Sequence, residues 1–201
     1  MNISGLITWI GIVLCAAALF VLCAAPALYQ KLCGLLGFYL GCAVLFTNSR
    51  SVQTALAFFV CGVGSAVLLS TGHVSLRERE PMPKIQKDVL LFRAAIFVIC
   101  GVIGYTAAVR MRSWISVGGV TLFVSLWAGL AGFIGLALEA DLLSRCVFLQ
   151  CVCAAFTFCY LHMDNGTVTF AGLTAINLLL ALSGAILNVP AAKASDEEAD
   201  K

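Results

Sequence analysis

The chain alternates between long apolar runs and short polar links. The apolar runs cover residues 6–25, 32–46, 52–70, 89–109, 114–138, 146–161 and 168–186. A helix needs about 20 residues to cross roughly 30 Å of hydrocarbon, and most of these runs approach that length. Backbone groups in lipid must bond within their own segment, as a helix allows. The pattern therefore predicts an all-α, polytopic transmembrane helix bundle of about seven spans.

The run 32–46 leaves a second arrangement open because it is the shortest. If it were re-entrant or interfacial, the chain would cross the bilayer six times. The first run also has the small residues of a signal-peptide cleavage site at its end, but no positive charge precedes it, so an uncleaved span is expected.

The run 114–138 is uncharged and carries a seam of small residues at helical steps of three and four. This seam consists of Gly118, Thr121, Ser125, Ala128, Gly132 and Gly135. Small side chains let neighbouring backbones approach closely in lipid. We therefore expect the other helices to gather round this one. Gly37 and Gly41 form a GxxxG pair and predict a second packing face.

Residues 1–189 are predicted to form a single transmembrane domain. The segment 73–88 is polar and contains Pro81 and Pro83, so it is expected to be a loop. Pro190 is expected to end the last helix, and residues 190–201 to form an acidic, disordered tail. If one of the seven spans is set aside as an addition, three spans precede the loop and three follow it. This arrangement suggests an inverted repeat, but the matching residues are few and chance explains them.

The basic residues are distributed unevenly across a seven-span arrangement. Only Arg50, Arg110 and Arg112, of the 12 Lys and Arg residues, fall on the N-terminal side of the membrane. The positive-inside rule then predicts an external N-terminus and a cytoplasmic C-terminus.

The composition excludes two broad classes of protein. Hydrophobic residues make up 62% of the chain and charged residues 11%, with a mean hydropathy of +1.04. A water-soluble domain needs more charge to cover its surface. The net charge of +2 and the lack of a basic patch argue against nucleic acid as a partner. The expected partners are the lipid bilayer and either other membrane subunits or further copies of this chain; which membrane is not indicated.

Charged and polar residues within or beside the spans are the candidates for function. Arg93, Glu139, Asp141 and Arg145 are predicted to form a charge cluster at one membrane surface, with Asp88 or Glu139 as the partner of Arg93. A carboxamide is costly to leave unpaired in hydrocarbon, so Gln150 and Asn177 are expected to face inward. Gln150 and Asn177 are expected to form hydrogen bonds between helices. Alternatively, with Thr121 and Ser125 they form a candidate polar interior that lines a permeation path.

The sequence offers no set of residues for catalysis, a cofactor or a metal. The two histidines, His73 and His162, are expected at opposite surfaces and so cannot share a ligand. A serine nucleophile would need a nearby base, and no histidine lies inside a span. No motif is specific enough to name a family. We expect a non-catalytic scaffold or accessory subunit, with a small transporter or channel for a neutral or weakly polar solute as the alternative.

Overall fold

The computed structural model describes residues 3–49, 52–74, 87–115, 117–163 and 166–199. These residues form seven helices: α1 (Ile3–Ala24), α2 (Leu28–Ser49), α3 (Val52–Val74), α4 (Lys87–Met111), α5 (Gly119–Leu138), α6 (Leu142–Met163) and α7 (Thr167–Ala199). Each contains an apolar stretch of 20–24 residues, long enough to cross a membrane. The predicted all-α, multi-pass fold is confirmed.

Most of the helices extend beyond their predicted apolar runs, and two of these extensions, in α2 and α7, change the predictions. α2 begins at Leu28, ahead of Lys31, and is as long as the other spans, so the reason for treating it as re-entrant disappears. α7 continues through Pro190 to Ala199. The predictions that this proline ends the helix and that a disordered tail follows were therefore wrong for the residues up to Ala199. Alanine is the strongest helix former, and the sequence after the proline contains several.

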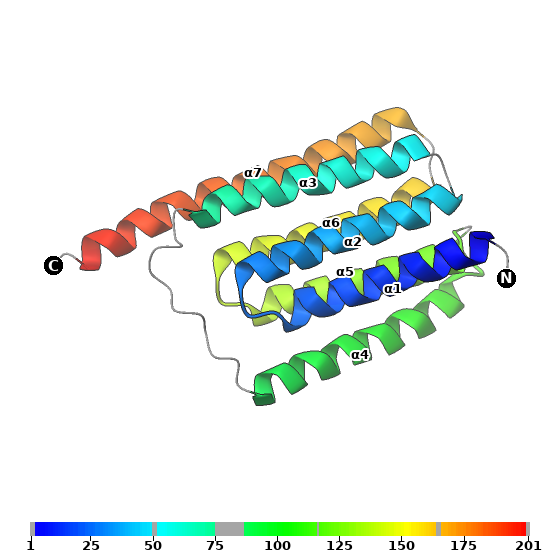
Figure 1. The fold of residues 1–201 in the computed structure, drawn as a ribbon, viewed down its shortest axis with the longest axis horizontal. Helices are drawn as coiled ribbons and strands as arrows, with labels where there is room; N and C mark the ends of the chain where they lie inside the picture. Colours follow the sequence, from blue (N-terminus) through cyan, green and yellow to red (C-terminus); the bar gives the residue numbers. More distant parts are fainter. Residues whose placement is uncertain (1–2, 50–51, 75–86, 116, 164–165, 200–201) are drawn as a thin grey trace.

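The helices are arranged in two rows. Figure 1 shows α1, α2 and α3 side by side, with α5, α6 and α7 in the same order behind them. α4 packs at the edge of the rows against α5 and α1. Because α4 returns the chain to the end where α1 began, α5 runs in the same direction as α1. The two three-helix sets are therefore parallel, and an inverted repeat with α4 as the extra span is excluded.

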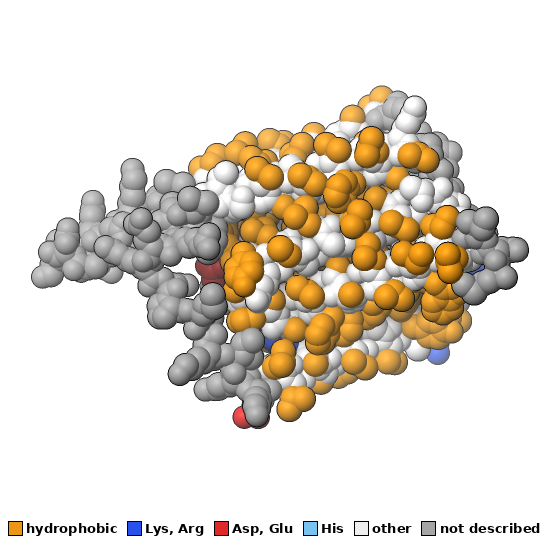
Figure 2. Space-filling view, viewed as in Figure 1, with side chains coloured by type: hydrophobic (Ala, Val, Ile, Leu, Met, Phe, Trp, Pro, Cys, Tyr) orange, Lys and Arg blue, Asp and Glu red, His pale blue; other side chains and the backbone are white. Residues whose placement is uncertain are grey.

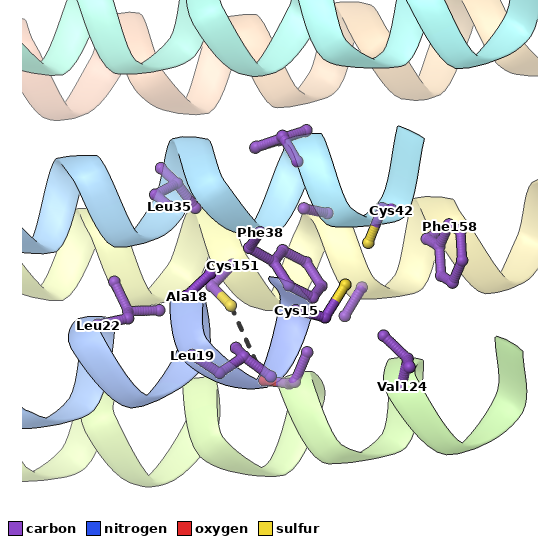
Figure 3. Packing of buried hydrophobic residues seen from close by; sticks show 14 of the residues in the cluster. Cys15, Ala18, Leu19, Leu22, Leu35, Phe38, Cys42, Val124, Cys151 and Phe158 are labelled. Atoms are coloured by element: carbon purple, nitrogen blue, oxygen red, sulfur yellow. Dashed lines mark hydrogen bonds between the residues drawn. The ribbon is translucent and has the colours of Figure 1, made fainter. Parts of the chain in front are cut away.

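The centre of the bundle is formed by α2 and α6. In each, 56% of the apolar stretch is buried, against 44% in α5 and 11% in α4. The expectation that the other helices gather round 114–138 was therefore wrong, because α5 uses its small residues mainly for one close contact with α6. Figure 3 shows Cys15 of α1, Phe38 of α2 and Phe158 of α6 filling the space between the rows.

The outer surface of the bundle is apolar along the length of its helices. Figure 2 shows hydrophobic side chains spread over the face it presents, and charged groups near the two ends. Large exposed side chains such as Val102, Phe133 and Leu179 are 59–61% exposed. Exposure of this surface to water would be unfavourable, whereas the hydrocarbon core of a bilayer is as apolar as the surface itself.

Candidate functional site

A group of five polar side chains lies buried between the outer helices α3 and α7 and the central helices α2 and α6. We call this group the polar cluster. It consists of Tyr39, Ser65, Gln150, Thr157 and Asn177, each 0–1% exposed. All five lie well inside their helices. The helices bring together residues that are far apart in the sequence, and they do so near the middle of the spans.

Gln150 is the hub of the polar cluster. Its Nε2 lies 3.1 Å from Tyr39 Oη, 2.9 Å from Ser65 Oγ and 3.3 Å from Asn177 Oδ1. These contacts connect α6 with α2, α3 and α7. Satisfied polar contacts of this kind hold helices together in lipid, where burial of apolar surface gives no driving force.

The orientation of both amides follows from their neighbours. Asn177 Nδ2 donates to Leu173 O at 3.1 Å, and a carbonyl can only accept. It also donates to Thr157 Oγ1 at 3.0 Å, whose hydroxyl hydrogen is directed to the Cys153 carbonyl. Asn177 Oδ1 must then face Gln150, which must present its nitrogen there. The Gln150 Oε1 atom has no hydrogen-bond partner among the described residues.

The hydrogen bond between the two amides gives a direct test of the polar cluster. We expect Gln150→Leu and Asn177→Leu to destabilise the protein by less in combination than the sum of their separate effects, with a coupling of about 0.6–1.7 kcal/mol. Equilibrium unfolding in mixed detergent micelles would measure all four proteins of the cycle. Additive effects would show that this contact does not couple α6 to α7.

The structure divides the predicted polar interior into two parts. It joins Gln150 and Asn177, whereas Thr121 and Ser125 are buried on α5 and no described hydrogen bond connects them to either amide. Ser125 Oγ also has no hydrogen-bond partner among the described residues. The sequence analysis missed Tyr39 and Ser65, because nothing in one sequence indicates that α2 and α3 approach Gln150.

A second group, the charged cluster, lies at the end of the bundle where α2, α4 and α6 begin. Glu139 follows α5, and its Oε1 lies 2.8 Å from Lys31 Nζ and 2.9 Å from Arg93 Nη2. Of the two partners expected for Arg93, the structure therefore selects Glu139. Lys31 is 1% exposed and also donates to Ser144 Oγ at 3.1 Å.

The remaining charged residues complete this end of the bundle. Arg145 donates its Nε to the Glu139 carbonyl at 2.6 Å. Asp141 Oδ2 accepts from the Ser144 backbone N–H at 2.8 Å, which caps the start of α6. All four residues of the predicted charge cluster thus lie together, and Lys31 joins them. Lys31 could have been foreseen, because it shares one helical face with buried Leu35, Phe38 and Cys42.

A small cavity lies beside the charged cluster, between α1, α4, α5 and α6. Arg93, Glu139 and Cys23 line its polar side, and Ile96, Ile134 and other apolar side chains its remainder. Its free space of about 20 Å³ is enough for one water molecule. Arg93 Nη1 donates to the Cys23 carbonyl at 3.3 Å along one wall. The charges are therefore accessible from a narrow, mostly apolar recess.

The predicted packing glycines lie at two interfaces. A Cβ on Gly37 would lie 3.1 Å from Ala18 Cβ, and one on Gly41 would lie 2.9 Å from the Cys15 backbone nitrogen, both on α1. Gly132 and Gly135 approach α6, where a Cβ on Gly135 would overlap the Phe148 ring. Ala128 is fully buried on the same face. Gly118 is exposed at the N-cap of α5, outside this interface.

Metal binding finds no support in the described part of the chain, which brings no three His, Cys, Asp or Glu residues together for an ion. His162 stacks on Phe46 with ring centroids 4.7 Å apart, and its Nδ1 lies 2.9 Å from the Phe158 carbonyl. The side chain of His73 lies outside the described residues.

No family model, curated protein or solved structure matches this chain. The chain is a multi-pass integral membrane protein. The part that the structure describes contains seven helices that are long and apolar enough to span a bilayer.

Proposed function

We propose that this protein is a non-catalytic component of a membrane assembly, either a scaffold or an accessory subunit. The observation that carries this proposal is the polar cluster. Apart from Gln150 Oε1, its amide and hydroxyl groups form hydrogen bonds that connect α2, α3, α6 and α7. A polar group used in this way fixes helix positions, as a rigid docking platform requires.

The chemistry of the buried groups supports a role other than catalysis. The polar cluster offers amides and hydroxyls, which are weak acids and bases at neutral pH. The carboxylate of Glu139 is paired with two cations, Lys31 and Arg93. General acid–base catalysis needs a group able to exchange protons with a substrate.

The test of the scaffold proposal is site-specific photo-crosslinking in the native membrane. A photoreactive amino acid would be placed at exposed Val102 on α4 and Leu179 on α7, with buried Val147 as the control position. A scaffold should give at least one discrete protein adduct from an outward position and none from Val147. Exclusive crosslinking to lipid from both outward positions would contradict a fixed protein partner.

A second function, passage of a small neutral solute, is favoured by one specific observation. Gln150 Oε1 is buried near the middle of the spans and has no hydrogen-bond partner among the described residues, although an unmet buried acceptor costs about 1–3 kcal/mol. A solute with an O–H or N–H group would satisfy it if α3 and α7 moved away from α2 and α6.

Proteoliposomes under a glycerol or urea gradient would test the solute pathway. A transporter should raise permeability above that of empty vesicles, and Gln150→Leu should remove the increase. Gln53→Leu is the matched control, because Gln53 is exposed near the start of α3. Permeability equal to that of empty vesicles would reject this second function and leave the scaffold proposal unaffected.

A further inference from the structure

The charged cluster contains more positive than negative side chains. Lys31, Arg93 and Arg145 all contact Glu139, and among the described residues the cluster contains one further acid, Asp141. In their usual charged forms these five side chains leave one positive charge. An excess charge at the boundary of a low-dielectric region is stabilised by a nearby counter-ion.

Arg93 is the cation of the cluster that borders the apolar recess, whereas Arg145 is exposed on α6 and does not line it. Its side chain is 20% exposed, whereas that of Lys31 is 2% exposed. The guanidinium has five N–H groups, and its described contacts are with Glu139 Oε1 and the Cys23 carbonyl. These contacts leave it the capacity to bind a further oxygen ligand, and guanidinium suits phosphate oxygens well.

The surroundings of Arg93 distinguish between a lipid and a soluble anion. Arg93 lies six residues beyond Lys87, the first residue of α4, which is about 9 Å along the helix axis. The adjoining recess has apolar walls that include Ile96 and Leu138, and Leu138 is 47% exposed. A phospholipid has the complementary arrangement, a charged phosphate next to hydrocarbon chains.

We propose that Arg93 and the recess beside it form a binding site for an anionic phospholipid, with the phosphate on the guanidinium and an acyl chain along Ile96 and Leu138. The predicted topology places this end at the cytoplasmic leaflet, where anionic lipids are concentrated. The site is independent of the proposed scaffold role, since it uses neither the polar cluster nor a protein partner.

Native mass spectrometry of the whole protein, released from micelles containing phosphatidylglycerol and phosphatidylcholine, would test this site. We expect phosphatidylglycerol to be retained in preference to phosphatidylcholine, and Arg93→Gln to reduce that preference about fivefold, as expected for one basic contact. Arg93→Lys, which keeps the charge, should retain most of it. Arg112→Gln, at the opposite end of α4 and exposed, should leave it unchanged.

Several results would overturn the proposal. Equal retention of both lipids by the unmodified protein would do so without any variant. An equal loss in Arg93→Gln and Arg112→Gln would indicate general surface attraction. Displacement of phosphatidylglycerol by inorganic phosphate would assign the site to a soluble anion.

Discussion

Glu139→Gln is expected to destabilise the protein by about 3–5 kcal/mol, the cost of leaving a buried charge without its partner. The carboxylate is the acceptor for both Lys31 and Arg93, at 2.8 and 2.9 Å. A glutamine has the same shape but carries no charge to balance either cation. Equilibrium unfolding in mixed detergent micelles, followed by circular dichroism, would measure the loss.

The two cations should contribute unequally to this loss. Lys31 is 1% exposed and cannot reach water without a movement of α2, whereas the side chain of Arg93 is 20% exposed and can extend towards the headgroups. Adding Lys31→Met to Glu139→Gln should therefore recover a large part of the lost stability. A double variant as unstable as the two single changes added together would show that Lys31 is not the stranded charge.

Asp141→Asn is the matched control for Glu139→Gln. It removes a carboxylate two residues further along the chain, but from an exposed position. Asparagine caps a helix about as well as aspartate, so the bond to the Ser144 N–H is retained. Its effect should be small. A loss equal to that of Glu139→Gln would point to the overall charge of this end and not to the buried pair.

The fold was largely predictable because membrane helices are specified by length and hydrophobicity. Each helix must satisfy its own backbone, so an apolar run of sufficient length predicts a span without reference to the rest of the chain. The error at α2 has a definite cause. Lys31 looked like a boundary, yet its pairing with Glu139 allows the charge to lie within the first turn of the helix.

The arrangement of the helices could not be read from one sequence. Small residues indicate that a helix packs closely, but they do not identify its neighbour. The faces of α2 and α5 were correctly seen as small, yet the centre belongs to α2 and α6. The same limit explains the polar cluster: Gln150 was a clear candidate, whereas Tyr39 and Ser65 become partners only when four helices meet.

The close contact between α1 and α2 requires a residue without a side chain at position 34, where the chain has Gly34. A Cβ there would lie 2.8 Å from the Leu22 nitrogen and 2.9 Å from the Ala18 carbonyl oxygen. Both are backbone atoms of α1, so no rotamer change can relieve the overlap. Overpacking of this kind costs about 1–3 kcal/mol, and we expect Gly34→Ala to lie near the upper end because two whole helices must separate.

Gly34→Ala is best measured beside Gly129→Ala, since the two substitutions are chemically identical and both lie within a helix. A Cβ on Gly129 would meet nothing within 4 Å. Alanine favours the helix over glycine by about 1 kcal/mol, so Gly129→Ala should be neutral or stabilising where Gly34→Ala is destabilising. Unfolding titrations of both variants in the same micelles would show directly whether each substitution raises or lowers the free energy of unfolding. If Gly34→Ala were as stable as Gly129→Ala, the two helices would have room between them, and close backbone contact could not be what holds α1 to α2.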